Sequence, residues 1–333
     1  MPRKHPPGSD PDGIVLTFPV AREHAGQRLD RFIQSRIPRL SRTRAQEIVK
    51  SCAYREDGTK RRASERVHAG EVVILVRPRF REPETPTAFG VVFEDDAILA
   101  LDKPAGLPMH PTATYHRNTL TYLLRQRYGD CPPHIAHRLD RETSGLVLCG
   151  KTLDAERSLK RAFERRRVEK TYLAITRGVI ELDEGHIDAA MGPATEGLHV
   201  LMELRAEADG GLPARTGYRV LSRAPAHTLV SLAPETGRQH QLRVHLTSIG
   251  HPIIGDKLYG PEGCQPFLDY IETGMTPALR ARLGHERQAL HAHRVRIAHP
   301  ATAEPLDLAA PLAPDLRALW ADVAGQAPPA DCC

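Results

Sequence analysis

Long apolar runs and a signal sequence are missing from this chain of 333 residues. Its longest apolar runs, residues 14–20 and 72–76, are far shorter than the roughly 20 residues that a membrane-spanning helix needs. The first ten residues, MPRKHPPGSD, are polar and proline-rich, whereas a signal peptide carries an apolar stretch near its start. We therefore expect neither a membrane span nor a signal peptide.

Cysteine is scarce, and its spacing follows no metal or redox motif. The six cysteines stand at positions 52, 131, 149, 264, 332 and 333, and no two of them form a C-x-x-C motif. This spacing gives no support to a zinc finger or a dithiol redox site. We expect a reduced, cytoplasmic protein.

Signature motifs of several enzyme classes are also absent. The sequence has no H-E-x-x-H, no G-x-x-x-x-G-K-[ST], no G-x-G-x-x-G after a predicted strand and no G-x-S-x-G. Metalloprotease, nucleotide hydrolase, dinucleotide oxidoreductase and serine hydrolase functions therefore lack support. His240 with His245, or His291 with His293, could bind a metal ion. No carboxylates are interleaved with them at helical spacing, so we expect no metal.

Charge is distributed unevenly between the two ends of the chain. Residues 1–81 contain 18 Lys and Arg against 9 Asp and Glu, a net charge of +9, while the remaining residues carry a net −4. A basic N-terminal module joined to a mildly acidic body indicates that the module meets a polyanion, most simply a nucleic acid.

The N-terminal module is predicted to hold two short helices and a strand. Ser41 is well placed to cap the second helix, and residues 70–76 read as the strand. The inward positions at helical spacing are Leu29, Phe32, Ile33, Ala45, Ile48 and Val49. The outward face carries Arg28, Arg31, Arg36, Arg39, Arg42, Arg44 and Lys50.

Composition also sets the expected boundaries. Residues 77–88 contain three prolines and no apolar period, which marks a linker. We divide the chain into a disordered tail (1–13), the basic module (14–76), the linker (77–88), a large body (89–320) and a C-terminal tail (321–333).

The body is predicted to be mainly strands. The strand candidates are residues 91–106, 145–148, 171–176, 228–232 and 295–297. Residues 154–167 place apolar side chains on one face of a helix and charges on the others. Many strands with few helices between them predict an α+β fold with a mainly antiparallel sheet.

One segment, H-R-L-D-R-E-T-S-G-L at residues 137–146, sets Asp140 among Arg138, Arg141 and His137. A carboxylate close to such cations stays ionised, as a carboxylate nucleophile must. A loop salt bridge is the plainer interpretation of the same residues.

A second segment, residues 236–246, gathers Arg238, His240, Arg243 and His245, which suits a phosphate or carboxylate partner. An exposed charged helix is the alternative. Tyr172, in a predicted strand, would ordinarily be packed with its hydroxyl satisfied. If it faced the same cleft as Asp140, it could instead stack on a base and move a proton.

These segments together closely resemble the RluA family of RNA pseudouridine synthases over residues 90–318. The motifs that carry the likeness are K-P-A-G-L (103–107), H-R-L-D-R-E-T-S-G-L (137–146), E-K-T-Y-L-A (169–174), T-G-R-Q-H-Q-L-R-V-H-L (236–246), H-P-I-I-G-D-K-L-Y-G (251–260) and L-H-A (290–292). The basic module resembles the small RNA-binding domain first known from the fourth protein of the small ribosomal subunit. It departs from that pattern at residues 51–59, which puts the domain's hairpin in doubt.

The resemblance implies that uridine in RNA is detached from its glycosidic nitrogen, rotated and rejoined through carbon 5, without cofactor or metal. Asp140 matches the catalytic aspartate, Arg243 the arginine that pairs with it, and Tyr172 the tyrosine that packs on the base. Leu290 is a candidate for the base pocket, although a core position suits it as well. The residues expected to contact RNA are Arg138, Arg141, Arg238, His240, Arg42 and Arg44.

The expected substrate is large-subunit (23S) ribosomal RNA or its precursor particle, because relatives with the basic domain mostly modify ribosomal RNA. Transfer RNA is the alternative substrate. A non-catalytic RNA-binding factor for ribosome assembly is the alternative of another class. The sequence predicts neither the target uridine nor the oligomeric state.

Overall fold

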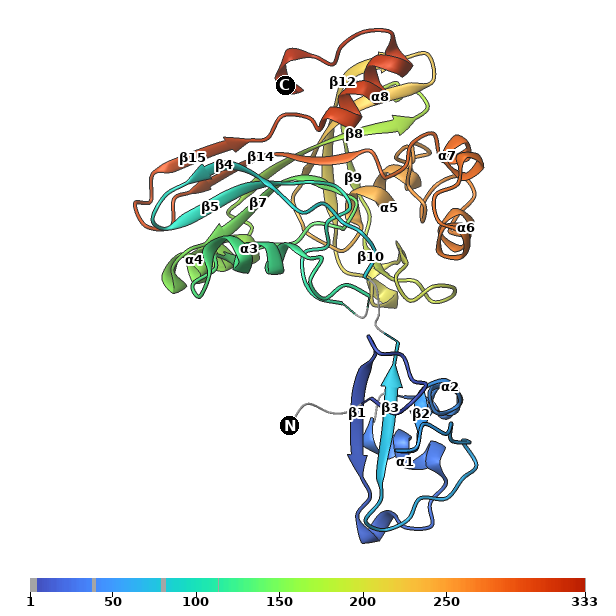
Figure 1. Ribbon diagram of the computed structural model, residues 1–333. Helices are drawn as coiled ribbons and strands as arrows, with labels where there is room; N and C mark the ends of the chain where they lie inside the picture. Colours follow the sequence, from blue (N-terminus) through green and yellow to red (C-terminus); the bar gives the residue numbers. More distant parts are fainter. Residues whose placement is uncertain (1–4, 38–39, 79–81, 113, 333) are drawn as a thin grey trace. The chain divides into compact units, whose positions relative to one another are not determined.

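The computed structural model describes residues 5–37, 40–78, 82–112 and 114–332. The chain forms two compact units, Met1–Arg81 and Glu82–Cys333 (Figure 1). Arg39, one of the arginines predicted on the outward face, lies outside the described residues.

The N-terminal unit is a three-stranded antiparallel sheet covered by two helices. Its elements are β1 (Ile14–Pro19), α1 (Leu29–Arg36), α2 (Arg42–Cys52), β2 (Ala53–Tyr54) and β3 (Val72–Arg77), with strand order β1-β3-β2. Ser41 caps α2, since its side chain accepts the backbone N–H of Arg44 at 3.2 Å. Five of the six predicted inward positions are buried, and Ile48 is partly buried.

The segment that departs from the family pattern still turns the chain. Tyr54 of β2 pairs with β3, and the N–H of Arg55 donates to the carbonyl of Thr59 at 2.8 Å. Asp57 and Gly58 make the turn: the Asp57 carboxylate accepts the N–H of Thr59, and Gly58 takes a φ of +88°. An Asp-Gly pair adopts this backbone readily, so the hairpin survives the change of sequence.

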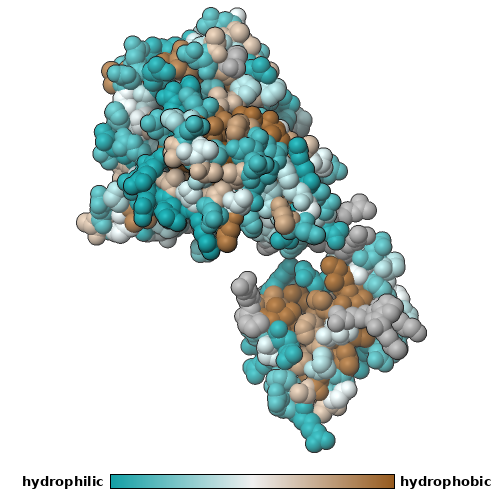
Figure 2. All heavy atoms as spheres, turned by 90° about the vertical axis from the view of Figure 1, so that its left-hand side faces the viewer, coloured by the Kyte–Doolittle hydropathy of each residue, from teal (hydrophilic) through white to brown (hydrophobic). Residues whose placement is uncertain are grey.

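Residues 5–13, expected to be a disordered tail, instead form turns. Pro6 is buried, and its carbonyl accepts both the N–H and the hydroxyl of Ser9. Figure 2 shows apolar surface on this unit, whose exposed large apolar residues are Ile14 and Val72 of the sheet. Proline-rich composition alone did not reveal that this segment lies against the turn at Gly58, where an added Cβ would collide with the backbone of Pro7.

The second unit is built on a ten-stranded mixed sheet of order β4-β5-β7-β14-β8-β13-β12-β9, with β15 beside β14 and β6 beside β7. The strands are β4 (Gly90–Glu94), β5 (Ile98–Lys103), β6 (His134–Ile135), β7 (Ser144–Gly150), β8 (Glu169–Arg177), β9 (Glu184–Asp188), β12 (Arg215–Ala224), β13 (His227–Pro234), β14 (Leu290–Ala298) and β15 (Pro305–Ala309). A hairpin of β10 (Met191–Pro193) and β11 (Met202–Leu204) stands apart. Only β7 and β14 pair in parallel among these described strands, which confirms the expected α+β, mainly antiparallel fold.

Helices cover both faces of this sheet (Figure 1). They are α3 (Leu120–Tyr128), α4 (Leu153–Glu164), α5 (Gln241–Ser248), α6 (Gln265–Thr273), α7 (Pro277–Leu283) and α8 (Pro314–Ala324). Leu99 and Leu101 of β5 cluster with α3, whereas Ile98 clusters with α4. Because successive strand residues point to opposite faces, β5 is buried on both sides.

Two expected boundaries differ from the structure. Helix α8 runs past residue 320, and its own Trp320 side chain is fully buried in the core. Cys332 is buried as well, and its carbonyl accepts the N–H of Leu312 at 2.7 Å. The second half of the expected linker belongs to the large unit, since the Glu82 carboxylate accepts the N–H groups of Arg117 and Asn118. In the described part of the chain, no helix is long and apolar enough to cross a membrane.

The parallel pairing of β7 and β14 determines where the conspicuous sequence segments meet. His291 pairs with Ser144, so the loops that precede the two strands, around Asp140 and Gln288, emerge at the same edge. Gly145 has a φ of +109°, and a side chain there would collide with the backbone of Ala292. Glycine therefore permits the close approach of the two strands.

Candidate active site

Asp140 lies in the loop between β6 and β7, opposite Arg243 of α5. The Nη1 of Arg243 donates to Asp140 Oδ2 at 2.9 Å. The other side of the same guanidinium donates to Asp256, from Nε to Oδ2 at 2.7 Å and from Nη2 to Oδ1 at 2.8 Å. Arg243 is thus held in a fixed orientation by one carboxylate while it faces another.

This arrangement keeps Asp140 ionised. Burial alone would raise the pKa of the Asp140 carboxyl, but the charge of Arg243, with contributions from His240 and Gln288, holds it below its ordinary value. The two carboxylates raise the pKa of Arg243 against the opposing effect of its burial. Neither Arg138 nor Arg141, the arginines that flank Asp140 in sequence, pairs with it among the described contacts; the ion pair with Arg243 of α5 instead produces the ionised carboxylate that the functional interpretation needs.

One oxygen of Asp140 carries all of these contacts. Oδ2 accepts from Arg243 and from Gln288 Nε2 at 3.3 Å, and it faces His240 Nε2 at 3.8 Å. Within the described residues, no side chain donates to Oδ1. The Asp140 side chain is 26% exposed, so this second oxygen is accessible to a substrate.

His240 is oriented by a hydrogen-bond chain. The N–H of Met202 donates to the hydroxyl of Tyr259 at 2.9 Å, and that hydroxyl lies 2.7 Å from His240 Nδ1. Burial raises the pKa of Tyr259 to about 12 and lowers that of His240 to about 4, so the tyrosine is protonated and the histidine neutral at pH 7. The hydroxyl therefore donates to Nδ1, and the ring proton stands on Nε2, toward Asp140.

The pocket beside Asp140 brings most of the predicted residues together. Tyr172 and Leu290 line it, from the neighbouring strands β8 and β14. Arg138, Arg238 and His240 line it too. Within the described residues, neither Arg138 nor Arg238 contacts a carboxylate; Arg238 Nε donates to the carbonyl of Pro213 at 3.3 Å.

Tyr172 is packed in the core and also lines the pocket of Asp140. Its ring packs against two core clusters, whereas its hydroxyl has no hydrogen-bond partner among the described residues. Burial, and then the charge of Asp140, raise the pKa of Tyr172 well above its ordinary value. A protonated, unpaired hydroxyl beside the carboxylate is available to a substrate.

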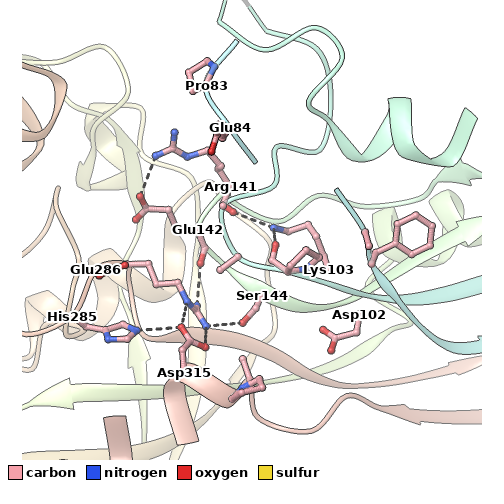
Figure 3. Close-up of a pocket in the computed structure, with 18 of the residues that line it drawn as sticks. Pro83, Glu84, Asp102, Lys103, Arg141, Glu142, Ser144, His285, Glu286 and Asp315 are labelled. Carbon is pink, nitrogen blue, oxygen red and sulfur yellow. Dashed lines mark hydrogen bonds and ion pairs between the residues drawn. The ribbon is translucent and has the colours of Figure 1, made fainter. Parts of the chain in front are cut away.

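Arg141 does not join this pocket. It turns to a neighbouring cavity of about 820 Å³, where Nη1 donates to the Tyr115 hydroxyl at 2.7 Å. Its Nη2 donates to Glu142 at 3.1 Å (Figure 3). Its guanidinium also lies over the rings of Tyr115 and Tyr270. Residues 140–143 form a turn, in which the N–H of Thr143 donates to the carbonyl of Asp140 at 3.1 Å, and this turn directs Arg141 away from the Asp140 pocket.

Two motif residues hold the catalytic loop in place. Lys103 is fully buried and donates to the carbonyls of Pro104, Leu107 and Arg141 at 2.9–3.1 Å. His137 accepts the N–H of Leu148 at 3.0 Å and stacks on Phe163. Burial lowers the pKa of His137 to about 3, so it remains a neutral acceptor.

Sequence reasoning assigned no role to Asp256, Gln288 or Tyr259. Two of them lie in the motif at residues 251–260, which contributed to the family likeness but whose spacing to α5 follows no local rule. The remaining expected contacts, Arg42 and Arg44, stand exposed on α2 of the other unit, and Arg44 pairs with Glu47 at 2.8 Å. Over the described residues, no group of three His, Cys, Asp or Glu side chains could hold a metal ion.

Comparison with known proteins gives a consistent result. Residues 97–248 match the family model described as RNA pseudouridylate synthase. The chain is 35% identical to "Ribosomal large subunit pseudouridine synthase D" of Nitrosomonas europaea over 94% of this chain and 89% of the relative. It is 36% identical to the protein of the same name from Pseudomonas aeruginosa, over 93% and 95% respectively. Among solved structures, "Human RNA Pseudouridylate Synthase Domain Containing 1" is similar with a TM-score of 0.56 and 29% identity, covering 72% of this chain and 90% of that one.

Proposed function

The chain belongs to the RNA pseudouridylate synthase family and is an RNA pseudouridine synthase, an isomerase; we propose that it converts uridine to pseudouridine in large-subunit ribosomal RNA. The observation that carries the chemistry is an ionised Asp140, paired with Arg243, in a pocket that also contains Tyr172. The relatives named above, 35–36% identical over nearly the whole chain, support the choice of RNA.

The reaction breaks the bond between uracil N1 and ribose C1′ and forms a bond between C5 and C1′. The C5 proton is released to the solvent and N1 gains a proton, so the composition of the nucleotide is unchanged. Asp140 starts the reaction through its uncontacted Oδ1, either by attacking C1′ or by assisting a glycal-like intermediate. Both routes require the carboxylate to be ionised, and Arg243 supplies that condition.

The remaining pocket residues position the nucleotide. Tyr172 packs on the detached base, and its hydroxyl serves proton transfer, while Leu290 contributes the apolar wall. Arg138 is exposed at the rim and enters the RNA stack in place of the flipped nucleotide. Such an insertion offsets the few kcal/mol that unstacking costs.

The N-terminal unit extends the RNA contact. Arg42 and Arg44 are exposed on α2, and the first 81 residues carry a net charge of +9. Phosphate contacts of this kind strengthen binding without reading sequence. A ribosomal RNA substrate, free or in a precursor particle, also implies that the protein acts where ribosomes assemble, in the cytoplasm.

Tritium release from RNA labelled at uridine C5 tests the proposal. Large-subunit ribosomal RNA and transfer RNA would be compared, with Asp140→Asn as the enzyme blank and EDTA present. Release by the wild type from the ribosomal RNA alone supports the proposal. Release from transfer RNA alone would make transfer RNA the substrate in place of ribosomal RNA. No release from either RNA or from precursor particles would favour a non-catalytic RNA-binding factor.

A further inference from the structure

Lys103 and Lys257 of the large unit are buried, and Lys170 of the pocket wall is partly buried. The two buried lysines have a full set of acceptors. Lys103 donates to three carbonyls. Lys257, 4% exposed, donates to both oxygens of Glu142 at 2.8 and 2.9 Å and to the carbonyl of Glu286. These contacts compensate the loss of water around each ammonium group.

Lys170 is the exception. It is partly buried in β8, and no described residue accepts a hydrogen bond from its Nζ or forms an ion pair with it. Burial lowers the pKa of Lys170, and the nearby charge of Arg166 lowers it further, so the surroundings disfavour the ammonium form. A cation left in this condition costs stability unless a partner arrives from outside.

Its position explains what the partner is. Lys170 and Tyr172 are two residues apart in the same strand, so their side chains share one face about 7 Å apart. Both line the pocket of Asp140. Gly237 lies on the facing turn, and a Cβ added there would stand 4.0 Å from Lys170 Nζ. Because glycine has no side chain, the ammonium lies at the edge of the pocket and is not covered at this position.

The other free charges around the pocket are also positive. Arg138 and Arg238 line it and contact no carboxylate among the described residues, whereas Arg243 is shared between Asp140 and Asp256. The pocket therefore offers several uncompensated cations to a substrate. RNA carries one phosphate per nucleotide, and a base packed on Tyr172 brings its own flanking phosphates within reach of the same strand face.

We propose that Lys170 binds a phosphodiester group directly flanking the target uridine. The inference rests on the proposed function, since the phosphate is defined by the base that Tyr172 holds. The contact is a charge-assisted hydrogen bond formed only when the nucleotide has left the helix and entered the pocket. It favours an RNA chain over a free nucleoside at the same site.

The first test compares Lys170→Gln and Lys170→Arg with the wild type and with Arg157→Gln. Arg157 is an exposed cation of α4 without an ion pair among the described residues, so its replacement removes one charge outside the pocket. For Lys170→Gln we expect KM to rise about tenfold with kcat changed less than about twofold. The slope of log Kd against log salt concentration should fall by about 1, and Lys170→Arg should restore most of both values.

The decisive substrate is an RNA oligonucleotide around the uridine that the wild type modifies, with a neutral methylphosphonate at the linkage 5′ or 3′ to it. At one of the two linkages, the methylphosphonate should lower kcat/KM about tenfold for the wild type and for Arg157→Gln. The kcat/KM of Lys170→Gln should not change with that replacement. Equal sensitivity of Lys170→Gln and wild type at both linkages would overturn the phosphate site.

Two controls separate the possible failures. Wild-type tritium release from the unmodified RNA is measured first; its absence refutes the proposed function, and the phosphate site with it. If the wild type is active and Lys170→Gln unfolds at a lower temperature, the lysine has a structural role instead. We expect an unchanged or higher melting temperature, because the substitution removes an unpaired charge.

Discussion

The catalytic pocket and the neighbouring cavity differ in what their charges contact. The pocket of Asp140 has a volume of about 100 Å³, and the cavity that Arg141 enters one of about 820 Å³. Among the described residues, no carboxylate contacts Arg138, Lys170 or Arg238 in the pocket. In the larger cavity, Arg141 and Arg287 are both ion-paired, and three backbone carbonyls accept hydrogen bonds from Lys103. On the proposed function, uncompensated cations rather than size mark the surface that we expect to receive RNA.

The ion pairs of the larger cavity instead hold the loop that carries Asp140 in place. Arg287 donates to both oxygens of Asp315, at 2.6 and 2.9 Å, and to the carbonyl of Glu142 (Figure 3). Among the described residues of its wall, the carboxylates without an ion pair are Asp102 and Glu84, which repel phosphate. Asp140 and Arg141 are neighbours in sequence, so the ion pairs of one cavity fix the reacting group of the other.

The strongest test of this contrast replaces a carboxylate with an amide in each cavity. Asp140→Asn should lower kcat by at least about 10³-fold, because an amide neither attacks C1′ nor accepts a proton. Asp102→Asn should change kcat by less than about twofold. Single-turnover rates on the same RNA check both, with filter binding to show that Asp140→Asn still binds. A comparable loss in Asp102→Asn would place chemistry in the larger cavity.

Arg243→Lys should reduce kcat about 10²-fold and shift its pH dependence. A lysine keeps one positive charge but cannot bridge Asp256 and Asp140 with a planar fork. Activity requires ionised Asp140, so it is present above the pKa of that group and lost as pH falls through it. With the pairing weakened, burial raises that pKa, and the acid limb of the kcat/KM profile should move to higher pH. An unshifted limb would show that Arg243 does not set the charge of Asp140.

The free energy of unfolding should depend on the ion pairs of the larger cavity and not on the pocket of Asp140. Arg287→Gln removes a buried partner of Asp315 and of several carbonyls, and we expect a loss of about 3 kcal/mol in the free energy of unfolding of the large unit. Lys170→Gln should cost nothing measurable. Urea denaturation followed by tryptophan fluorescence reports on this unit, because Trp320, the chain's one tryptophan, lies in it. Equal losses would mean that both cations are structural.

The sequence predicted much of this arrangement and missed the rest for identifiable reasons. Alternation and helical spacing located β5, β7, β8 and α4, whose apolar faces are local. Asp140 was conspicuous because its flanking cations are adjacent in sequence. Gln288 was missed because it reaches Asp140 across 148 residues of chain, through the pairing of β7 with β14. Asp256 was missed because its contact with Arg243, 13 residues away, depends on a turn and follows neither helical nor strand spacing. Arg141 was expected on the RNA, but a symmetrical R-L-D-R sequence does not tell which side of a loop each arginine takes.

The smallest effect should come from two hydroxyls, that of Tyr259 behind His240 and that of Tyr270 in the larger cavity. Tyr259→Phe removes the donor to His240 Nδ1 and leaves the Met202 N–H without its acceptor, so the ring proton is free to move to Nδ1. We expect kcat to fall about three- to tenfold, with the ring ¹⁵N shifts of His240 showing a mixture of tautomers. Tyr270→Phe keeps the ring over Arg141 and loses a hydroxyl that bonds to no described residue, so kcat should not change. Because both variants lose one oxygen, a fall confined to Tyr259→Phe assigns the effect to the orientation of His240 beside Asp140. A normal rate in Tyr259→Phe would instead show that the reaction does not depend on that proton.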